Sequence, residues 1–191
     1  MSNGKKLGEI LKKQSGPFDP AIMARGLKDG LAGGKTLLTD QEAQAAVESM
    51  RSDLVKKAAA ASRKEGDDFL AANKSKEGVV TLPSGLQYKI VTAGTGPKPT
   101  ASDTVACNYR GTLIDGKEFD SSYKRGQPSK FAVTGVIKGW TEALQLMPVG
   151  SKWQLFIPAD LAYGDSGQSG IPPGSALIFE IELVSIEEQK K

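Results

Sequence analysis

A long helical run, from Thr39 to about Asn73, most constrains how this chain can fold, because no residue within it strongly breaks a helix. The run opens with a capping box, in which Thr39 and Glu42 can each satisfy a free backbone donor of the other residue. At 1.5 Å per residue, such a helix is on the order of 50 Å long. The sequence therefore predicts one extended helix, followed by a polar joint that ends at Gly78.

Apolar residues recur along the first part of this helix at alternating steps of four and three, at Ala43, Val47, Met50 and Leu54. This spacing is typical of a coiled-coil seam. Beyond Leu54 the seam gives way to lysines, alanines and a glycine. A helix with one apolar end and a polar remainder indicates a stalk. The alternative is a helix that lies along the other domain.

The segment before the stalk also predicts a helix, with Asp19 as its N-cap, Pro20 at its first position and an end near Leu31. Residues 1–38 are too short, and too poor in large apolar residues, to bury a core by themselves. We therefore predict that a second copy of the chain covers them, which makes the protein a homodimer through its N-terminal segment. Residues 1–38 are then a dimerisation segment, and 39–78 are the long stalk helix and linker.

Residues 79–191 change from helical to alternating periodicity, which is typical of strands. Asp115-Gly116 lies between two strand-like runs and predicts a hairpin. A short helix is expected at 142–147, where Pro148 ends it. The sequence thus predicts an α+β domain, an antiparallel sheet with one short helix against one face. Cys107 falls on the apolar face of a strand and is expected to be a small buried side chain.

Composition excludes several classes of function. The chain has no histidine and one cysteine, which removes Ser-His-Asp and Cys-His catalysis, internal disulfides and nearly every zinc site. Residues 1–78 carry 14 basic and 11 acidic side chains, so that 79–191 carry 11 of each. A neutral second part argues against nucleic acid as a partner. No apolar run is long enough to span a membrane.

The stretch from Gly135 to Trp140 is the most distinctive part of the second half. Two branched apolar residues, a glycine and a tryptophan would suit the floor of a pocket, because Trp140 offers a large apolar plate. A helix that begins beside it would leave backbone N–H groups free to meet a ligand carbonyl. The alternative is an ordinary core tryptophan at the start of a helix.

Six motifs in one order resemble the FKBP-type peptidyl-prolyl cis-trans isomerases over roughly residues 84–186. They are Tyr109-Arg-Gly111, Asp115-Gly-Lys-Glu-Phe-Asp-Ser-Ser122, Val136-Ile-Lys-Gly-Trp140, Leu161-Ala-Tyr-Gly164, Ile171-Pro-Pro-Gly174 and Leu177-Ile-Phe-Glu180. The preceding residues are similar to the dimeric macrophage infectivity potentiator (Mip) branch of that family. The resemblance implies an all-α dimerisation segment with a stalk helix, and then a half-barrel of antiparallel strands wrapped around a short helix, with an apolar cleft between them in residues 79–191.

The resemblance also implies the residues of the cleft. Trp140 would be the floor for a proline ring, the Ile137 N–H and the Tyr163 hydroxyl would hold carbonyl groups, and Asp120 would accept hydrogen bonds in the wall. Ser129, Gly135 and Gln168 border the cleft at positions where many family members carry other residues. The catalytic set implied is Tyr109, Phe119, Asp120, Ile137, Trp140, Tyr163 and Phe179, and the binding set is Arg125, Val136, Ile171 and Phe131.

The implied reaction suits these residues, because rotating an X–Pro bond breaks no covalent bond and needs no metal or cofactor. The barrier of about 18–20 kcal/mol comes from amide resonance, which weakens when the imide leaves water and is held twisted. Implied partners are proline-containing peptides, unfolded protein clients and macrolide inhibitors of the FK506 and rapamycin type. Two alternatives are a proline-peptide or client-binding chaperone module with little turnover, and a dimeric scaffold that holds unfolded clients. The location expected is the cell envelope, periplasm or outer membrane, if an export signal was trimmed, and the cytoplasm if the chain is complete as written.

Overall fold

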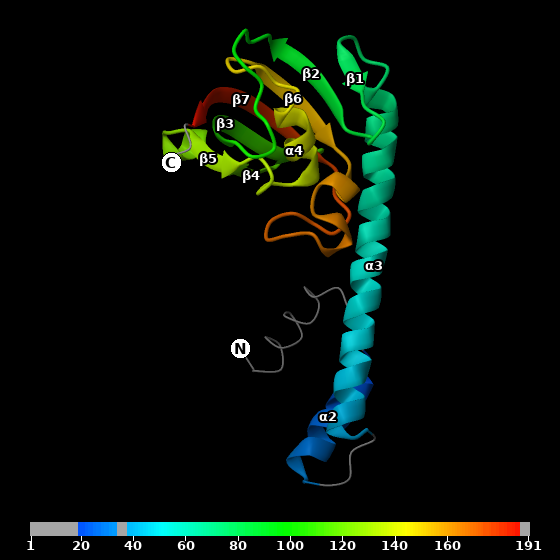
Figure 1. The fold of residues 1–191 in the computed structure, drawn as a ribbon. Coiled ribbons are helices and arrows are strands. Elements are labelled where there is room, and N and C mark those ends of the chain that lie inside the picture. Colours follow the sequence, from blue (N-terminus) through cyan, green and yellow to red (C-terminus); the bar gives the residue numbers. More distant parts are fainter. Residues whose placement is uncertain (1–18, 34–37, 188–191) are drawn as a thin grey trace. The chain divides into compact units, whose positions relative to one another are not determined.

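The computed structural model describes residues 19–33 and 38–187 (Figure 1). Contacts divide the chain into two compact units, Met1–Met50 and Arg51–Lys191. In the first unit, helix α2 spans Pro20–Leu31, and the Asp19 carboxylate accepts a hydrogen bond from the Ala21 N–H at 2.8 Å. The expected N-cap and the expected end of this helix are both confirmed.

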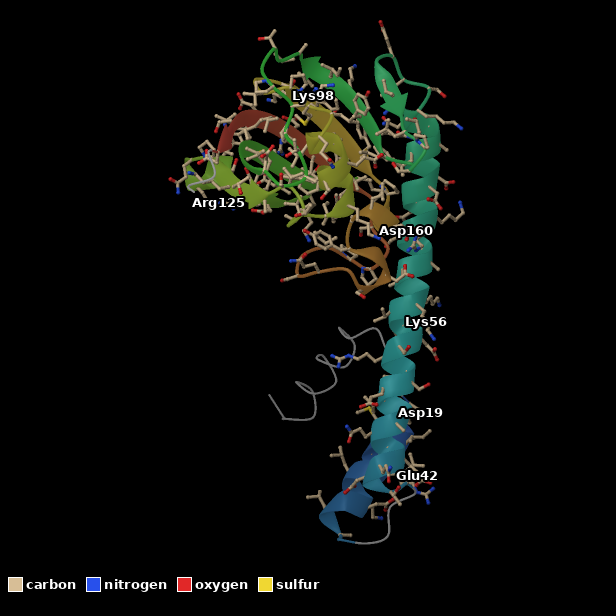
Figure 2. The ribbon with its side chains drawn as sticks, viewed as in Figure 1. Asp19, Glu42, Lys56, Lys98, Arg125 and Asp160 are labelled. Atoms are coloured by element: carbon tan, nitrogen blue, oxygen red, sulfur yellow. The ribbon has the colours of Figure 1, made fainter. Side chains whose placement is uncertain are left out.

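Helix α3 spans Asp40–Asn73, 34 residues, so the predicted extended helix is confirmed. Its capping box is formed: the Glu42 carboxylate accepts from the Thr39 N–H at 2.8 Å, and the Thr39 hydroxyl accepts from the Glu42 N–H at 3.3 Å. Asp19 and Glu42, the acidic residues at these two helix starts, are labelled in Figure 2. Of the predicted seam, Val47 and Leu54 are exposed.

A seven-stranded antiparallel sheet forms most of the second unit, with strand order β1-β2-β6-β7-β3-β4 and β5 paired to β3. β3 and β4 form the hairpin predicted at Asp115-Gly116. The strands are β1 (Val79–Thr81), β2 (Gln87–Thr92), β3 (Thr104–Leu113), β4 (Glu118–Ser121), β5 (Ser129–Ala132), β6 (Lys152–Ile157) and β7 (Leu177–Glu187).

The short helix α4 spans Lys138–Leu144, so its expected position at 142–147 was wrong by several residues at each end. The helix begins earlier because Ile137, in an extended conformation, acts as its N-cap, and Trp140 lies inside it. It ends earlier because the chain tightens before Pro148: the Leu146 N–H donates to the Ala143 carbonyl at 2.9 Å, three residues back. The described part of this unit also contains three 3-10 helices, η1 (Tyr123–Arg125), η2 (Ala159–Leu161) and η3 (Gly164–Ser166).

The main core lies between α4 and one face of the sheet, as the predicted α+β arrangement requires. Leu144 and Met147 are fully buried there against residues of β3, β6 and β7 such as Leu155 and Ile181. Cys107, on β3, is also fully buried, and burial raises the pKa of its thiol to about 12. Its predicted role as a small core side chain is confirmed.

The opposite face of the sheet is covered by the second half of α3. Phe156 alternates with the core residues Leu155 and Ile157, so it points to the other face, where it packs with Leu70 and Ala176. Asn73, where the helix was expected to pass into a polar joint, is 1% exposed. Residues 59–73 therefore follow the alternative interpretation of the sequence, in which the helix lies along the other domain.

A pair of buried amides fixes this end of α3 to β2. The Asn73 side chain donates to the Gln87 side-chain carbonyl at 3.0 Å, and the Gln87 amide donates to the Leu70 backbone carbonyl at 2.9 Å. Both side chains are buried, so each hydrogen bond satisfies a group that water cannot reach. In residues 19–33 and 38–187, no helix is long and apolar enough to cross a membrane.

Candidate active site

The start of α4 places the floor of the site. Gly139 lies on the side of α4 that meets β6, and an added Cβ there would come within 2.6 Å of the Ile157 side chain. The glycine thus lets α4 approach the sheet closely. The Thr141 hydroxyl donates to the Val133 carbonyl at 2.7 Å and ties the helix to the segment after β5. Together these contacts hold the Trp140 indole, which is buried, in one position.

Three aromatic rings stand nearly perpendicular to the Trp140 ring. Tyr109 lies with its ring centroid 5.2 Å away at 84°, Phe131 at 5.4 Å and 80°, and Phe179 at 5.2 Å and 83°. Phe119 in turn meets Phe179 edge-on, with centroids 5.5 Å apart. Edge-to-face pairs of this kind are favourable beyond the area they bury. The result is an apolar box with a flat floor and upright walls.

The box opens into a cleft of about 430 Å³, a size suited to a few residues of peptide or a small ligand. Its lining is mostly aromatic and branched, with a few polar groups at the rim. The lining residues are Tyr109, Phe119, Asp120, Phe131, Gly135, Val136, Ile137, Trp140, Tyr163, Gln168 and Phe179.

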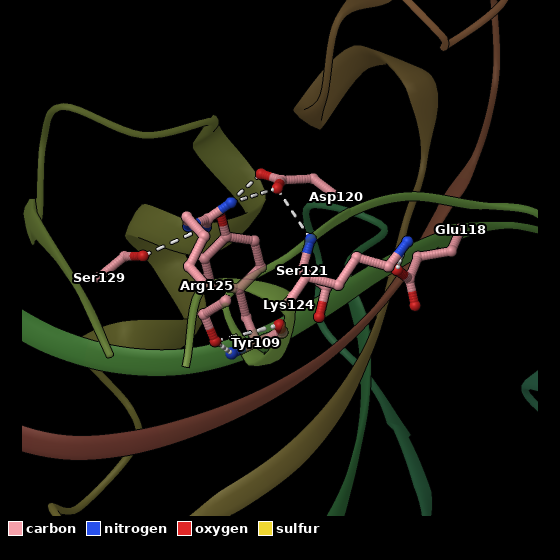
Figure 3. A network of polar contacts seen from close by, with 8 residues as sticks. Tyr109, Glu118, Asp120, Ser121, Lys124, Arg125 and Ser129 are labelled. Atoms are coloured by element: carbon pink, nitrogen blue, oxygen red, sulfur yellow. Dashed lines mark hydrogen bonds and ion pairs between the residues drawn. The ribbon is translucent and has the colours of Figure 1, made fainter. Parts of the chain in front are cut away.

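A polar network closes one wall (Figure 3). The Tyr109 hydroxyl donates to Asp120 at 2.5 Å, and the Arg125 guanidinium donates to Asp120 at 2.8 Å and to the Tyr109 hydroxyl at 2.6 Å. The Ser121 N–H donates to the same carboxylate at 2.8 Å, and the Ser129 hydroxyl accepts from Arg125 at 3.2 Å. Asp120 therefore accepts from three donor residues, of which Tyr109 also lines the cleft.

These contacts set the charge of the network. Burial opposes ionisation of Asp120, but the hydrogen bonds from Tyr109 and Arg125, together with the charge of Arg125, outweigh it and hold the pKa of this carboxyl below its ordinary value. Burial and the bond to Asp120 raise the pKa of Tyr109. Burial and the Asp120 charge likewise raise the pKa of Tyr163. Around neutral pH the site thus contains one carboxylate and two neutral phenols.

Several polar hydrogens of the cleft-lining residues have no acceptor among residues 19–33 and 38–187, the buried indole N–H of Trp140 among them. Two others are the backbone N–H of Ile137 and the hydroxyl of Tyr163. Ile137 is the N-cap residue of α4, where backbone donors are normally left free. Both groups can therefore donate to a carbonyl bound over the Trp140 floor.

The cleft contains nine of the eleven site residues predicted from the sequence. Arg125 does not line it, but it holds two residues that do. Ile171 was expected on the lining and is instead 6% exposed and part of the main core. The reason is local: backbone hydrogen bonds of 3.0 and 2.8 Å pair Gln168 with Ile171, and it is Gln168 that lines the cleft. Gly135 and Gln168 border the cleft as the resemblance implied.

Sequence reasoning missed the residues that support the rim from outside, Arg63 with Asp160 and Asp165. Arg63 lies on α3, about a hundred residues before its partners, and no local pattern links them. The signal available was the pair of small residues Ala59 and Gly66, which are buried on one side of α3. Small residues on one helix face indicate close packing against a neighbouring backbone.

In the described parts of the chain, no cluster of three or more acidic, cysteine or histidine side chains could hold a metal ion.

Comparison with known proteins agrees with this geometry. Residues 96–184 match the family described as FKBP-type peptidyl-prolyl cis-trans isomerase, and residues 1–90 match the domain described as amino terminal to FKBP-type peptidyl-prolyl isomerase. The chain belongs to the FKBP-type isomerases and is a peptidyl-prolyl cis-trans isomerase of that type.

Within the family, its two-part organisation is that of the Mip and FkpA proteins. The chain is 49% identical over 195 residues to the outer membrane protein MIP of Legionella longbeachae, covering 98% of this chain and 84% of that protein. It is 41% identical over 196 residues to the peptidyl-prolyl cis-trans isomerase Mip of Coxiella burnetii, covering 98% and 85%. The crystal structure of FkpA from Escherichia coli matches with a TM-score of 0.80 and 39% identity over 96% of this chain and 92% of that chain.

Proposed function

We propose that the cleft accelerates X–Pro rotation by taking the imide out of water and holding it twisted over Trp140. The observation that carries this proposal is the aromatic box with two free donors at its rim, the Ile137 N–H and the Tyr163 hydroxyl. Removing about 5 kcal/mol from the barrier would give an acceleration of several thousand-fold. An apolar enclosure that weakens amide resonance is a sufficient source for that amount.

In this mechanism the remaining site residues position the substrate and do not exchange protons with it. Trp140 supports the proline ring, while Tyr109, Phe119, Phe131, Val136 and Phe179 exclude water from it. Asp120 stays ionised because Tyr109 and Arg125 hold it, and it keeps the wall in place. The ligands that fit are proline-containing peptides and unfolded clients, and macrolide inhibitors would occupy the same box.

The test is the cis-to-trans relaxation of a short X–Pro–Phe peptide, which takes tens to hundreds of seconds without catalyst. The protein should accelerate it, and excess macrolide should abolish the acceleration. Tyr163→Phe should lower kcat/KM about tenfold, the value of one lost hydrogen bond. Tyr123→Phe, which removes a hydroxyl from an exposed ring outside the cleft, is the matched control and should not change the rate. Acceleration that persists at saturating macrolide would reject the cleft as the site.

We also propose that residues 1–38 form the dimerisation segment, that 39–78 form the stalk and linker, and that 79–191 carry the isomerase. The support is a set of exposed large apolar side chains on α2 and the first part of α3, which isolated surfaces rarely carry together. They include Ile22, Leu27, Leu31, Val47 and Leu54. A second copy of the chain would cover them, and the dimer would then offer unfolded clients two copies of the isomerase domain to bind, which is the basis of a chaperone role.

Sedimentation of the full chain at micromolar concentration tests the dimer. Val47→Asp should shift the protein toward monomer, because it places two like charges in the predicted seam. The same variant should leave peptide isomerisation unchanged, since Val47 is not among the residues that line the cleft, and should reduce the suppression of client aggregation. A wild-type monomer would reject the dimer.

The outer membrane protein among the relatives supports a cell-envelope location, which cell fractionation would test.

A further inference from the structure

We propose that Arg63 of α3 is a positioning residue for the active site, acting through the segment Ala159–Ser175, which we name the rim loop. The rim loop contributes Tyr163 and Gln168 to the cleft. The inference rests on the proposed role of Tyr163 as a donor to the bound peptide. It assigns to the long helix a direct part in peptide isomerisation, separate from any part in dimerisation.

One guanidinium holds two turns of the rim loop. Arg63 donates from Nη2 to the Asp160 carboxylate at 2.6 Å and from Nε to the Asp165 carboxylate at 2.6 Å. Asp160 lies in η2 and Asp165 in η3, so the two contacts fall on either side of Tyr163 in the sequence. The guanidinium is planar and presents its donors in a rigid fork. The distance between the two turns, and with it the place of Tyr163, is therefore tied to α3.

Backbone packing strengthens the tie at the other end of the rim loop. A Cβ added to Gly174 would lie 2.4 Å from the Ala59 carbonyl oxygen, so the loop backbone touches the helix backbone there. About two turns further along the same side of the helix, a Cβ added to Gly66 would lie 2.9 Å from the Ala176 side chain. The small residues on this side of α3 thus make room for the rim loop and for the start of β7.

The rim loop is also closed on itself, so a shift at its outer side reaches the cleft. The Gly174 N–H donates to the Gly164 carbonyl at 2.9 Å, and this hydrogen bond closes the segment 164–174, which contains η3. The Gln168 and Ile171 backbones pair within that closed segment. Since the turns are linked to one another, loss of the Arg63 contacts would displace Tyr163 and Gln168 together.

The Arg63 contacts are better suited to positioning the rim loop than to stabilising the fold. The Asp160 and Asp165 side chains are 75% and 64% exposed, and exposed ion pairs contribute little to the free energy of unfolding. Substrate binding is more sensitive, because a small misplacement of a substrate-holding group weakens its contact with the bound peptide and so lowers kcat/KM. The hydrogen bond from Arg63 also lowers the pKa of Asp160, so this partner is ionised at neutral pH.

The experiment compares Arg63→Gln with Lys64→Gln in the full chain, using the X–Pro–Phe peptide. Lys64 is the next residue on α3 and pairs with Asp68 of the same helix, so its variant removes a charge without touching the rim loop. We expect Arg63→Gln to raise KM about fivefold, with kcat within about twofold of wild type, because a ground-state binding contact is displaced. Lys64→Gln should match wild type. Arg63→Lys should fall between them, because one ammonium reaches two separated carboxylates less well than the fork does.

A double variant distinguishes positioning from general weakening. In a Tyr163→Phe background, Arg63→Gln should have a smaller further effect on KM, because the route through the Tyr163 hydroxyl is already lost and only that through Gln168 remains. Asp165→Ala removes one of the two contacts from the loop side and should raise KM in the same direction as Arg63→Gln even if the helix variant folds poorly. An unchanged KM in Asp165→Ala, or effects of Arg63→Gln and Tyr163→Phe that multiply, would overturn the inference. An unchanged Tyr163→Phe would instead reject the proposed donor itself.

Discussion

Between Asp40 and Leu54, α3 carries large apolar side chains that are exposed, whereas between Ala59 and Asn73 the residues that it buries include the small Ala59 and Gly66. Val47 is 59% exposed, and Ala59 is 3% exposed. Both halves have the same secondary structure and no strong helix breaker. The difference shows that helix propensity decides only that a helix forms. The size of the side chains decides how closely another backbone can approach it, and so what each half can bind.

The largest expected effect comes from filling the closest approach in the second half. Gly174→Ala should lower the free energy of unfolding by about 3 kcal/mol or more, because it combines a strained φ of 73° with a clash against the Ala59 carbonyl. Gly126→Ala is the matched control, with φ of 71° and no atom within 4 Å, and should cost about 1 kcal/mol. Chemical denaturation measures both, and equal losses would mean that the helix yields at Ala59.

Two substitutions, one in each half of α3, should differ in their effect on the free energy of unfolding, by less than the effect above. Asn73→Leu should cost about 2 kcal/mol of unfolding free energy, because it leaves the buried Gln87 side-chain carbonyl without its donor. Gln44→Leu removes an exposed hydrogen bond to Glu48 in the first half and should change stability by no more than about 0.5 kcal/mol. Denaturant titration of the two variants side by side gives the comparison. If Gln44→Leu proved as costly as Asn73→Leu, burial would not be what distinguishes the halves.

A change of pH should have the smallest effect on peptide isomerisation. Peptide isomerisation should vary less than about twofold between about pH 6 and about pH 9, because the chain has no histidine and the perturbed groups lie outside that window. The folded pKa values of Asp120 and Asp160 are lowered. Their stabilising contribution is therefore complete above the ordinary carboxyl pKa, near 4, and is lost as pH falls through the lowered values. A stopped-flow rate profile with a midpoint near neutrality would contradict this.

The sequence predicted most where the cause of a structure is local. The Thr39–Glu42 capping box, the Asp19 cap and the Asp115-Gly116 hairpin each depend on residues within a few positions of one another, and all three are present. The position of α4 was predicted less well, because its start depends on the extended conformation of Ile137 and on packing against β6. These are tertiary causes that periodicity does not record.

The cleft shows the same division. The order of motifs indicated the aromatic box, because the family's residues occur here at matching positions. It did not indicate that Ile171 would be buried in the core, which follows from its backbone pairing with Gln168. Nor did it indicate the Arg63 contacts, since two aspartates on a loop and an arginine on a helix are common in any sequence. Such contacts depend on where α3 packs, and the sequence allowed either a stalk or a helix that lies along the other domain.

The single cysteine of the chain has a practical consequence. Cys107 is fully buried in the middle of β3, between β5 and β7, and burial raises the pKa of its thiol to about 12. A thiol reagent can reach it only when the core around it opens. The rate of labelling therefore reports, in the intact protein and without an engineered cysteine, how often the scaffold beneath the cleft opens.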